Sequence, residues 1–467
     1  MMEHTAKIVC PLFKATKKKG RWKSKQIFSF FLLCILVFSS LTSFSQTKKK
    51  RRWADLIDTT ARITNGMLCD DFIYKPYIRT VQLHDVSFEL SQPILSLESD
   101  EKLILSFDDL DADNKNYMYT LIHCTSDWKP DDLSTSDYID GFPDNVIIDY
   151  KYSINTIQSF THYSVSFPND NMKITKSGNY ILKVYQDSKP DNLVLTKRFM
   201  VFQNKVSVEA RVKPASIIEY RTFKQEIDFS IFHTEYAITD PYQDLKVVIT
   251  QNNRWDNAKT NLKPLFVKDD ELVYDYDDVN VFDGGSEFRV FDIKSIRYHS
   301  ERIRNIYKDT LGVHVELQPD EKRSFKRYSS APDMNGNYIV KIQEGTYSNV
   351  EADYCSVTFF IPFDNAISDG KLYVAGAFND WKYLPENEMK FNPKRFGYEC
   401  TLYLKQGYYN YEYMFIYNNE PAPDQTFIEG MHQETENDYT IYVYHHPVGT
   451  FYDQLIGVKR LNSIKNR

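Results

Sequence analysis

LILSF at residues 103–107 and YSVSF at residues 163–167 carry large apolar side chains at every second position. Because successive side chains of a strand point to opposite faces, Leu103, Leu105 and Phe107 share one face of a strand. The second segment repeats this arrangement, and turn-forming residues follow both segments. The two segments therefore predict half-buried strands of an antiparallel sheet.

The same period of two recurs along most of the chain. In the first block it covers residues 117–124, 179–185 and 193–202, and this spacing predicts an immunoglobulin-like antiparallel sandwich. The chain has 34 Tyr and 31 Phe among 467 residues, which favours sheets, since both side chains suit half-buried pleated surfaces. Further runs of this kind are residues 227–232, 245–250, 313–317, 357–362, 372–375, 398–404 and 408–417.

These runs predict an all-β protein built of tandem antiparallel β-sandwich domains, immunoglobulin-like or early-set in type, after a cleaved signal peptide. The apolar fraction of 42% supports real cores and argues against a disordered or collagen-like chain. Residues 296–307 stay ambiguous, because their apolar residues recur at helical spacing while their composition suits a strand. The expected division is a signal peptide at 1–45, a flexible basic N-terminus at 46–70, β-domains at 71–204, 205–350 and 351–455, and a tail at 456–467.

The N-terminal stretch is typical of an export signal. Residues 1–26 hold eight basic residues and one acidic residue, and the apolar run 27–38 follows them. Small and polar residues then lead to Gln46, so we expect cleavage after Ser45 and export from the cytoplasm. The alternative is an uncleaved anchor, because residues 27–44 approach the roughly 20 apolar residues that span a bilayer.

The mature chain is acidic. Of 57 Lys and Arg and 64 Asp and Glu, removal of residues 1–45 takes away eight basic residues and one acidic residue, which leaves 49 and 63 and a net charge of −14. A nucleic-acid or anionic-membrane partner needs a basic face, so this balance disfavours both. The basic cluster at residues 48–52 is a local exception, and we interpret it as a solvated, flexible terminus.

The sequence contains no motif that supports catalysis. A GxSxG elbow, an HExxH helix, a P-loop and a GxGxxG turn after a strand are all absent. The ten histidines are scattered, and the adjacent pair His445 and His446 is expected to point to opposite faces of a strand. We therefore predict a non-enzymatic protein with no catalytic residues, no metal site and no cofactor.

Two acidic clusters are weak candidates for cation binding. Asp109, Asp111 and Asp113 imitate the start of a calcium loop, but Asn114 stands where that loop needs Gly, so we expect a polar hairpin turn. The acidic residues at 275–278 are interpreted as a solvated loop.

The four cysteines that follow the signal are Cys69, Cys124, Cys355 and Cys400. None belongs to a CxxC pair, which disfavours zinc. Cys355 and Cys400 fall in one expected domain and are compatible with a disulfide. Cys69 and Cys124 are equally compatible with buried thiols.

The segment GAFNDW at residues 376–381 contains the pattern G-x-F-N-x-W. With its flanking strands it resembles, over about 50 residues, the early-set β-sandwich of glycogen-binding modules, in which the Trp stacks on a sugar. That resemblance implies a contact with a glycan or partner through Phe378, Asn379 and Trp381. Glu412 stands near the position of the family's Lys, however, and no second Trp follows, so we expect Phe378 and Trp381 mainly to hold the turn against the core.

Taken whole, residues 70–455 resemble the plug protein family of the type IX secretion system of Bacteroidota. The resemblance depends on the order of several phrases: DFIY at 71–74, IRTV at 78–81, YTLIHCTSDW at 119–128, EFRVFDIKS at 287–295, NGNY at 335–338 and GAFNDW at 376–381.

The resemblance implies a periplasmic protein, associated with the inner face of the outer membrane, that plugs the periplasmic opening of the giant translocon barrel when no cargo is engaged. The implied partner is that barrel, without nucleic acid and without a membrane span after signal cleavage. The alternative is a periplasmic or surface glycan-binding protein that acts through the C-terminal module, and a glycan is the disfavoured ligand. A hydrolase with a β-sandwich appendage would need a catalytic domain that the first 350 residues do not show.

Overall fold

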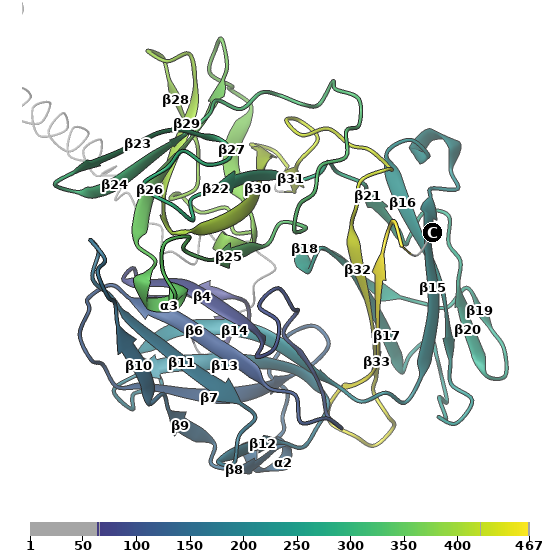
Figure 1. The fold of residues 1–467 in the computed structure, drawn as a ribbon. Helices are drawn as coiled ribbons and strands as arrows, with labels where there is room; N and C mark the ends of the chain where they lie inside the picture. Colours follow the sequence, from purple (N-terminus) through teal and green to yellow (C-terminus); the bar gives the residue numbers. More distant parts are fainter. Residues whose placement is uncertain (1–62, 65, 421, 466–467) are drawn as a thin grey trace, which may run out of the picture. The chain divides into compact units, whose positions relative to one another are not determined.

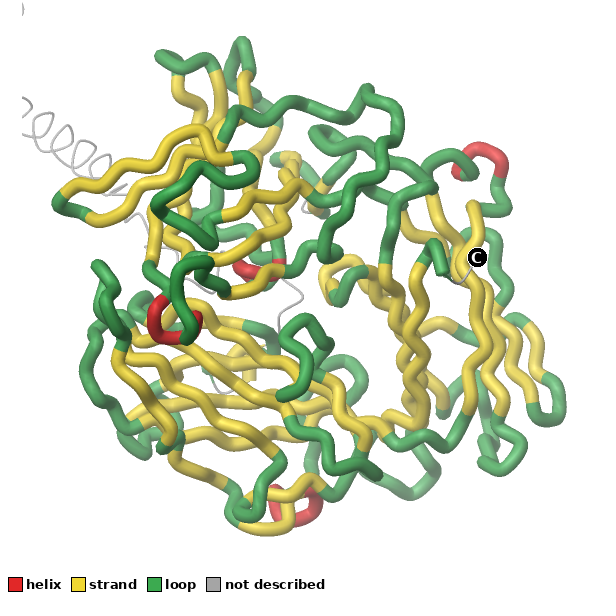
Figure 2. The backbone as a smooth tube through the Cα atoms, in the orientation of Figure 1, coloured by secondary structure: helices red, strands yellow, loops and turns green. Residues whose placement is uncertain are grey.

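The computed structural model describes residues 63–64, 66–420 and 422–465. Strands form nearly half of this part of the chain and its few helices are short, which confirms the all-β fold class (Figures 1 and 2). None of the helices described is long and apolar enough to cross a membrane. The expected signal peptide and the basic cluster at residues 48–52 lie outside the described residues.

The first β-sandwich pairs a sheet of order β10-β11-β6-β4 with a sheet of order β3-β14-β13-β7-β9, to which β5 adds in parallel beside β14. Two small sheets, β1-β2 and β12-β8, accompany it. Its elements are β1 (Ile63–Thr64), β2 (Met67–Leu68), β3 (Phe72–Ile73), β4 (Ile78–Asp85), β5 (Ile94–Ser96), β6 (Leu103–Asp109), β7 (Tyr117–Cys124), α2 (Thr135–Tyr138), β8 (Ile139–Gly141), β9 (Asp144–Val146), β10 (Asp149–Tyr152), β11 (Thr161–Phe167), β12 (Met172–Ile174), β13 (Gly178–Gln186) and β14 (Leu193–Phe202).

The two alternating segments at 103–107 and 163–167 are neighbours in this sandwich. β6 and β11 pair antiparallel, with Phe107 opposite Tyr163 and Leu103 opposite Phe167. These four side chains are fully buried, so the apolar faces predicted from the sequence line one core. The turn after Asp109 differs from the expected hairpin, because it leads from β6 in one sheet to β7 in the other.

The second β-sandwich combines a sheet of order β15-β16-β20-β19, with β21 beside β16, and a sheet of order β18-β17-β32-β33. Apolar side chains from both sheets form its core. Its elements are β15 (Ser207–Pro214), η2 (Ile218–Tyr220), β16 (Lys224–Phe232), β17 (Leu245–Gln251), β18 (Arg254–Leu262), β19 (Phe266–Val267), β20 (Glu271–Tyr274), β21 (Val281–Asp283), β32 (Asp438–His445) and β33 (Gln454–Asn462).

The third β-sandwich places β22, β25, β27 and β31 around the long strand β30 and faces them with a sheet of order β23-β24-β26-β29-β28. The ambiguous segment 296–307 enters this sheet as a strand from Ile303 onward. The elements are β22 (Arg289–Asp292), β23 (Ile303–Asp309), β24 (Gly312–Leu317), β25 (Tyr338–Val340), α3 (Ser348–Glu351), β26 (Tyr354–Pro362), β27 (Gly370–Ala375), η3 (Ala377–Asn379), β28 (Lys390–Asn392), β29 (Gly397–Lys405), β30 (Gly407–Tyr417) and β31 (Pro423–Asp424).

Strand pairing does not follow the order of the chain. β22, β24 and β25 belong to the expected middle domain at 205–350, yet they pair with strands that lie beyond residue 350. β32 and β33 return to the second sandwich, where β32 pairs with β17 and β33 pairs with β32, so the third sandwich is an insertion within the second. Residues 456–462, expected in a tail, form most of the partly buried strand β33. As separate folding units, the segments 71–204, 205–350 and 351–455 stay a prediction.

The first and second sandwiches share an apolar interface. The outer face of the β7-β13-β14 sheet contributes Cys124, Ile181 and Met200, and the facing sheet contributes Tyr442 and Leu455. Tyr444 donates a hydrogen bond across the interface to Asn179 at 2.8 Å. Because this face of each sheet is buried by the other, the two sandwiches pack as layers of one body.

Candidate functional site

The G-x-F-N-x-W turn connects β27 to the loop before β28. The Asn379 side chain closes it, since its Oδ1 accepts a hydrogen bond from Gly376 N at 3.1 Å and its Nδ2 donates to Val374 O at 3.0 Å. The Phe378 ring packs edge-on against Tyr409, 5.9 Å between centroids. Asn379 and Phe378 therefore hold the turn against the third sandwich.

The Trp381 ring is also covered by protein. Only 9% of Trp381 is exposed, and the Arg254 guanidinium from the second sandwich lies 4.3 Å from the ring centroid. Phe288 packs edge-on at 5.8 Å, and a Cβ on Gly336 would lie 2.5 Å from a ring atom. A sugar-binding platform needs an exposed aromatic face, which Trp381 does not present here. As glycan contacts, Phe378, Asn379 and Trp381 stay a prediction.

Around this turn, charged side chains from all three sandwiches interlock. Lys197 of β14 contacts Asp380 at 2.6 Å and Asp71 at 3.6 Å. Asp70 pairs with Arg198 of β14 at 3.1 Å and with Lys382. We call this group the junction cluster, and its members are Asp70, Asp71, Lys197, Arg198, Arg254, Asp256, Asp380, Lys382 and Glu412.

Arg254 joins the second sandwich to the third. Its guanidinium contacts Glu412 of β30 at 2.8 Å and Asp256 at 2.7 Å, and all three side chains are mostly buried. Burial raises the pKa of Glu412 to about 7, because the attraction of Arg254 offsets only part of the desolvation. Burial likewise raises the pKa of Asp380, despite the opposing attraction of Lys197.

The junction cluster has four basic and five acidic members, so their charges nearly cancel. A cleft opens beside the cluster, lined by its charged side chains and by residues 81–84 and 89–93. Because the positive and negative charges nearly balance, the cluster does not attract an anion or a cation strongly. Each charge in the cluster is instead paired with an opposite charge of the protein. We interpret the junction cluster as a set of ion pairs that holds the sandwiches together.

A second buried network joins the first sandwich to the third. The Asp108 carboxylate of β6 accepts hydrogen bonds from Lys405 Nζ of β29 at 2.5 Å, Tyr354 OH of β26 at 2.7 Å and His162 Nδ1 at 2.7 Å. Burial alone would raise the pKa of Asp108, but the attraction of Lys405 and His162 lowers it below its usual range. Asp108 and Lys405 are about 1% exposed at the side chain, so no substrate reaches this constellation.

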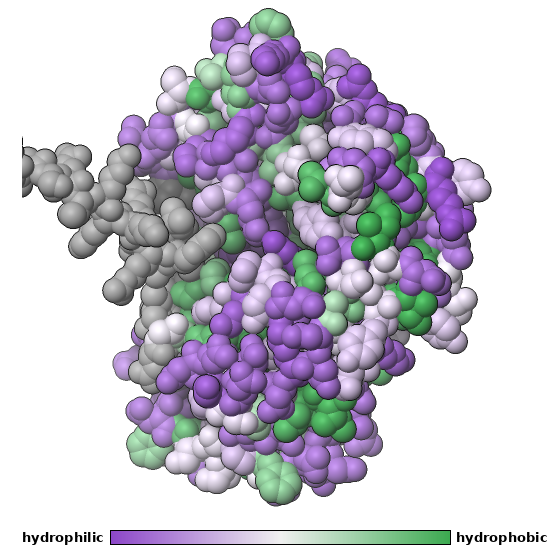
Figure 3. All heavy atoms as spheres, turned by 90° about the vertical axis from the view of Figure 1, so that its left-hand side faces the viewer, coloured by the Kyte–Doolittle hydropathy of each residue, from purple (hydrophilic) through white to green (hydrophobic). Residues whose placement is uncertain are grey.

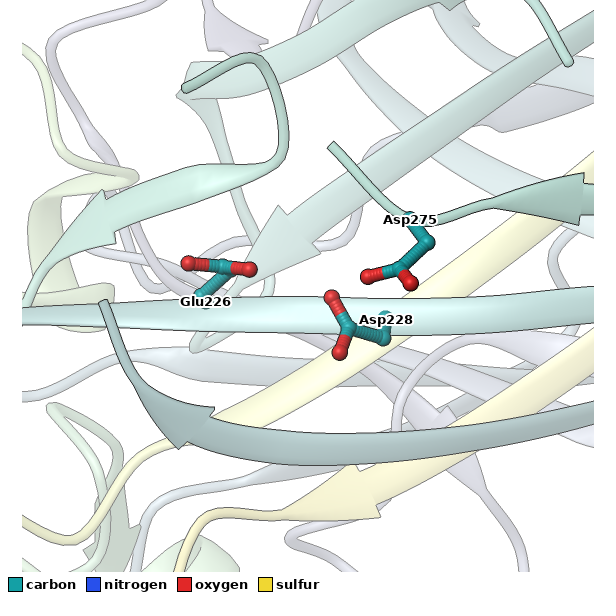
Figure 4. Close-up of side chains that lie close together, drawn as sticks. All are labelled: Glu226, Asp228 and Asp275. Atoms are coloured by element: carbon teal, nitrogen blue, oxygen red, sulfur yellow. The ribbon is translucent and has the colours of Figure 1, made fainter. Parts of the chain in front are cut away.

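The acidic clusters that might hold a cation contain lysines instead. Figure 4 shows Glu226 and Asp228 on one strand, with the Asp275 carboxylate facing Asp228. Lys213 Nζ lies 3.0 Å from Glu226, 2.7 Å from Asp228 and 3.8 Å from Asp275, and therefore takes the place of a metal ion.

Lys115 does the same for the cluster that imitates a calcium loop. Its Nζ contacts Asp109 at 2.9 Å, Asp113 at 3.4 Å and also Asp111. A Lys ammonium is a compact charge that satisfies several carboxylates at once. In both acidic clusters a lysine of the protein itself thus bridges the carboxylates.

The remaining candidates from the sequence lie apart from one another. His445 Nδ1 is 2.7 Å from Tyr236 OH, whereas His446 pairs with Asp453 at 2.9 Å, so the adjacent histidines have separate partners. Cys355 lies opposite Leu404 and Cys400 opposite Phe359, which places the cysteines four residues apart along paired strands. That is roughly 13 Å, beyond the reach of a disulfide. Cys69, Cys124, Cys355 and Cys400 are all buried, and Cys124, Cys355 and Cys400 are free thiols.

The fold and the site define a class: a mostly β-structured scaffold in which clusters of charged side chains join the described sandwiches. Comparison with protein families gives a match over residues 78–203 to the "Type 9 secretion system plug protein 1st domain". A solved structure of a hypothetical protein from Parabacteroides merdae is 31% identical with a TM-score of 0.81, and the match covers 84% of this chain and 99% of that one. No curated protein matches the chain.

The chain belongs to the plug protein family of the type IX secretion system. Proteins of this family are structural components of a secretion system. β27, which leads into the G-x-F-N-x-W turn, pairs antiparallel with β30, and the early-set likeness of the third sandwich stays a prediction.

The sequence predicted the G-x-F-N-x-W turn but not the junction cluster around it. Asp70, Lys197 and Arg254 are isolated charges in the sequence and meet only because three sandwiches converge. The available signal was the unusual placement of Lys197 and Glu412 within runs that otherwise read as buried strands. Charges at core positions indicate partners across an interface.

Proposed function

We propose that this protein is a periplasmic plug that closes the inner opening of the type IX outer-membrane translocon barrel when no cargo occupies it. The family membership is the observation that carries this proposal. In this reading the protein works by occupying space and by docking, with no catalytic step, no cofactor and no metal.

The buried contacts that join the three sandwiches support the proposal. A plug must resist deformation when it covers a wide pore, and each pair of sandwiches here is joined by buried contacts. Tyr444 and Asn179 join the first to the second, Asp108 and Lys405 join the first to the third, and Arg254 and Glu412 join the second to the third. Breaking any one leaves an unpaired buried polar group, so hinge motion between sandwiches is costly.

The proposed location and partner follow from the same reading. Export would deliver the chain to the periplasm, where its acidic surface, at a net charge of −14 after removal of residues 1–45, would steer it toward a basic rim. We place it at the inner face of the outer membrane, bound to the barrel and without a membrane span of its own.

Conductance measurements test the closure directly. The translocon would be purified from a strain that lacks this protein and inserted into planar bilayers, and the chain from residue 46 would then be added to the periplasmic side. We expect stepwise loss of conductance that reverses on washing. Open channels at saturating protein would refute the proposal. Heat-denatured protein controls for nonspecific blockage.

A further inference from the structure

One edge of the first sandwich exposes an unusual amount of apolar surface. The segment 142–154, which we call the edge ribbon, contains β9, β10 and the turn between them. It holds six of the 25 large apolar side chains that are exposed in the described part of the chain. They are Phe142 (63% exposed), Val146 (46%), Ile148 (75%), Tyr150 (39%), Tyr152 (53%) and Ile154 (47%). Such concentration marks an interaction surface, because isolated exposed apolar residues are ordinary whereas contiguous ones are not.

The edge ribbon also has unused backbone groups. β9 ends one sheet of the sandwich and β10 ends the other. All four residues of β10 are exposed, and among the described residues the strand pairs only with β11. The outer edge of such a strand presents free N–H and C=O groups, which another extended strand can satisfy.

The side chains of β10 are sorted by face. Tyr150 lies opposite the buried Tyr163, with ring centroids 5.8 Å apart, so Tyr150 and Tyr152 project on the core side of the sheet. Asp149 and Lys151 project on the other side. A strand added beside β10 would place its own side chains against the two tyrosines, which lie at the edge of the core with no strand beyond them.

Charge narrows the nature of the occupant. Asp144 and Asp149 are exposed within the edge ribbon, against the single cation Lys151. A partner strand with Lys or Arg among its apolar residues therefore fits better than an acidic one. Figure 3 views the side that carries β10, and apolar side chains interrupt the polar surface in its lower part, over the first sandwich.

We infer that the edge ribbon binds an extended periplasmic segment of the translocon barrel protein, outside the paired strands of the barrel itself, by strand addition to β10. This inference rests on the proposed function and names the docking surface that the function requires. The occupant is a protein strand with alternating apolar and basic side chains, because backbone pairing requires an extended polypeptide.

Matched charge variants test the surface. Ile148→Asp combined with Tyr152→Asp disrupts the edge ribbon, and Ile218→Asp combined with Tyr242→Asp is the control, because those residues are 77% and 49% exposed on the second sandwich. Each tagged chain would be used to capture the barrel from detergent-solubilised outer membranes. We expect the ribbon variant to retain at least tenfold less barrel, and the control to retain as much as the wild type. Circular dichroism melting verifies that both variants fold.

Hydrogen exchange separates strand addition from a side-chain contact. In the captured complex, the amides of residues 149–152 should exchange at least tenfold more slowly than in the free chain. The edge strand β19, whose Phe266 and Val267 are also exposed, serves as the internal control and should not change.

Three outcomes overturn the inference. Full barrel capture by the folded ribbon variant, or unchanged exchange at 149–152, refutes the docking surface while the proposed function stands. A wild-type dimer that the ribbon variant converts to a monomer would show that the occupant is a second copy of the chain. No barrel captured by the wild type would refute the proposed function and this inference together.

Discussion

Replacement of Lys405 by Met removes the cation at the centre of the interface between the first and third sandwiches. Met keeps most of the packing of the aliphatic chain, but it removes the ammonium that lies 4.1 Å from the Phe160 ring centroid, and it leaves the Asp108 carboxylate without its closest charged partner. It also removes a hydrogen bond from Lys405 Nζ to Asn349 O at 2.7 Å. The variant thus leaves one buried charge and one buried carbonyl less well satisfied.

The expected cost follows from what remains. Loss of one partner from a fully buried pair destabilises by about 3–5 kcal/mol. Asp108 keeps two donors, Tyr354 OH and His162 Nδ1, each at 2.7 Å, so we expect the lower limit, about 3 kcal/mol. For domains of this size that is roughly 5–10 °C in melting temperature. Asp108→Leu combined with Lys405→Met should recover part of the loss, because neither charge then remains buried.

Thermal unfolding, followed by circular dichroism at pH 7, measures the stability of the wild type and of these variants. The pKa of Asp108 is below its usual range in the folded protein, so its stabilisation is present above about pH 4 and is lost as the pH falls further. Without Lys405 that pKa rises, and acid unfolding should begin at a higher pH. A melting temperature within 1 °C of wild type, with unchanged acid unfolding, would refute the idea that this pair joins the sandwiches.

Other side chains give independent tests. Burial raises the pKa of Glu412 to about 7, so its ionisation destabilises the fold as the pH rises from 5 to 8; Glu412→Gln should flatten this loss, up to about 3 kcal/mol, in melting curves across that range. Trp381→Ala should cost about 3–5 kcal/mol in denaturant unfolding and change no glycan retention, whereas sugar binding abolished by this variant would contradict the buried turn. Gly336→Ala, at φ +82° and against the Trp381 ring, should cost about 1–3 kcal/mol alone and less beside Trp381→Ala; additive costs would argue against their contact. Burial raises the pKa of Cys355 and of Cys400 to about 12, so maleimide should label both only in denaturant, as read by mass spectrometry.

Local features of the fold were predictable from the sequence. Residues 117–124 and 193–202 form strands with the predicted limits, because alternating side chains and turn residues determine them locally. The same holds for β30, which extends the predicted run 408–417 by one residue. A strand with alternating residues needs only neighbouring strands and one buried face, and many partner strands satisfy that requirement.

Which strands pair was not predictable. Residues 438–445 have the pattern of any half-buried strand, and nothing local indicates that Tyr442 belongs opposite Val248. The candidate site shares this limit: Trp381 was identified by its motif, whereas Arg254, which covers its ring, lies 127 residues earlier in an unremarkable strand. Contacts between distant segments depend on the whole topology.

The interrupted second sandwich has a consequence for how the protein is made. β17 needs β32 as a neighbour and β32 needs β33, but about 190 residues separate β17 from β32 in the chain. A polypeptide that crosses a membrane from its N-terminus would thus complete the first sandwich while half of the second waited, its apolar face open to proteases and aggregation. In such a passage the second sandwich would stay incomplete until β32 and β33 arrive, and loss of residues 438–462 would remove both of these strands from it.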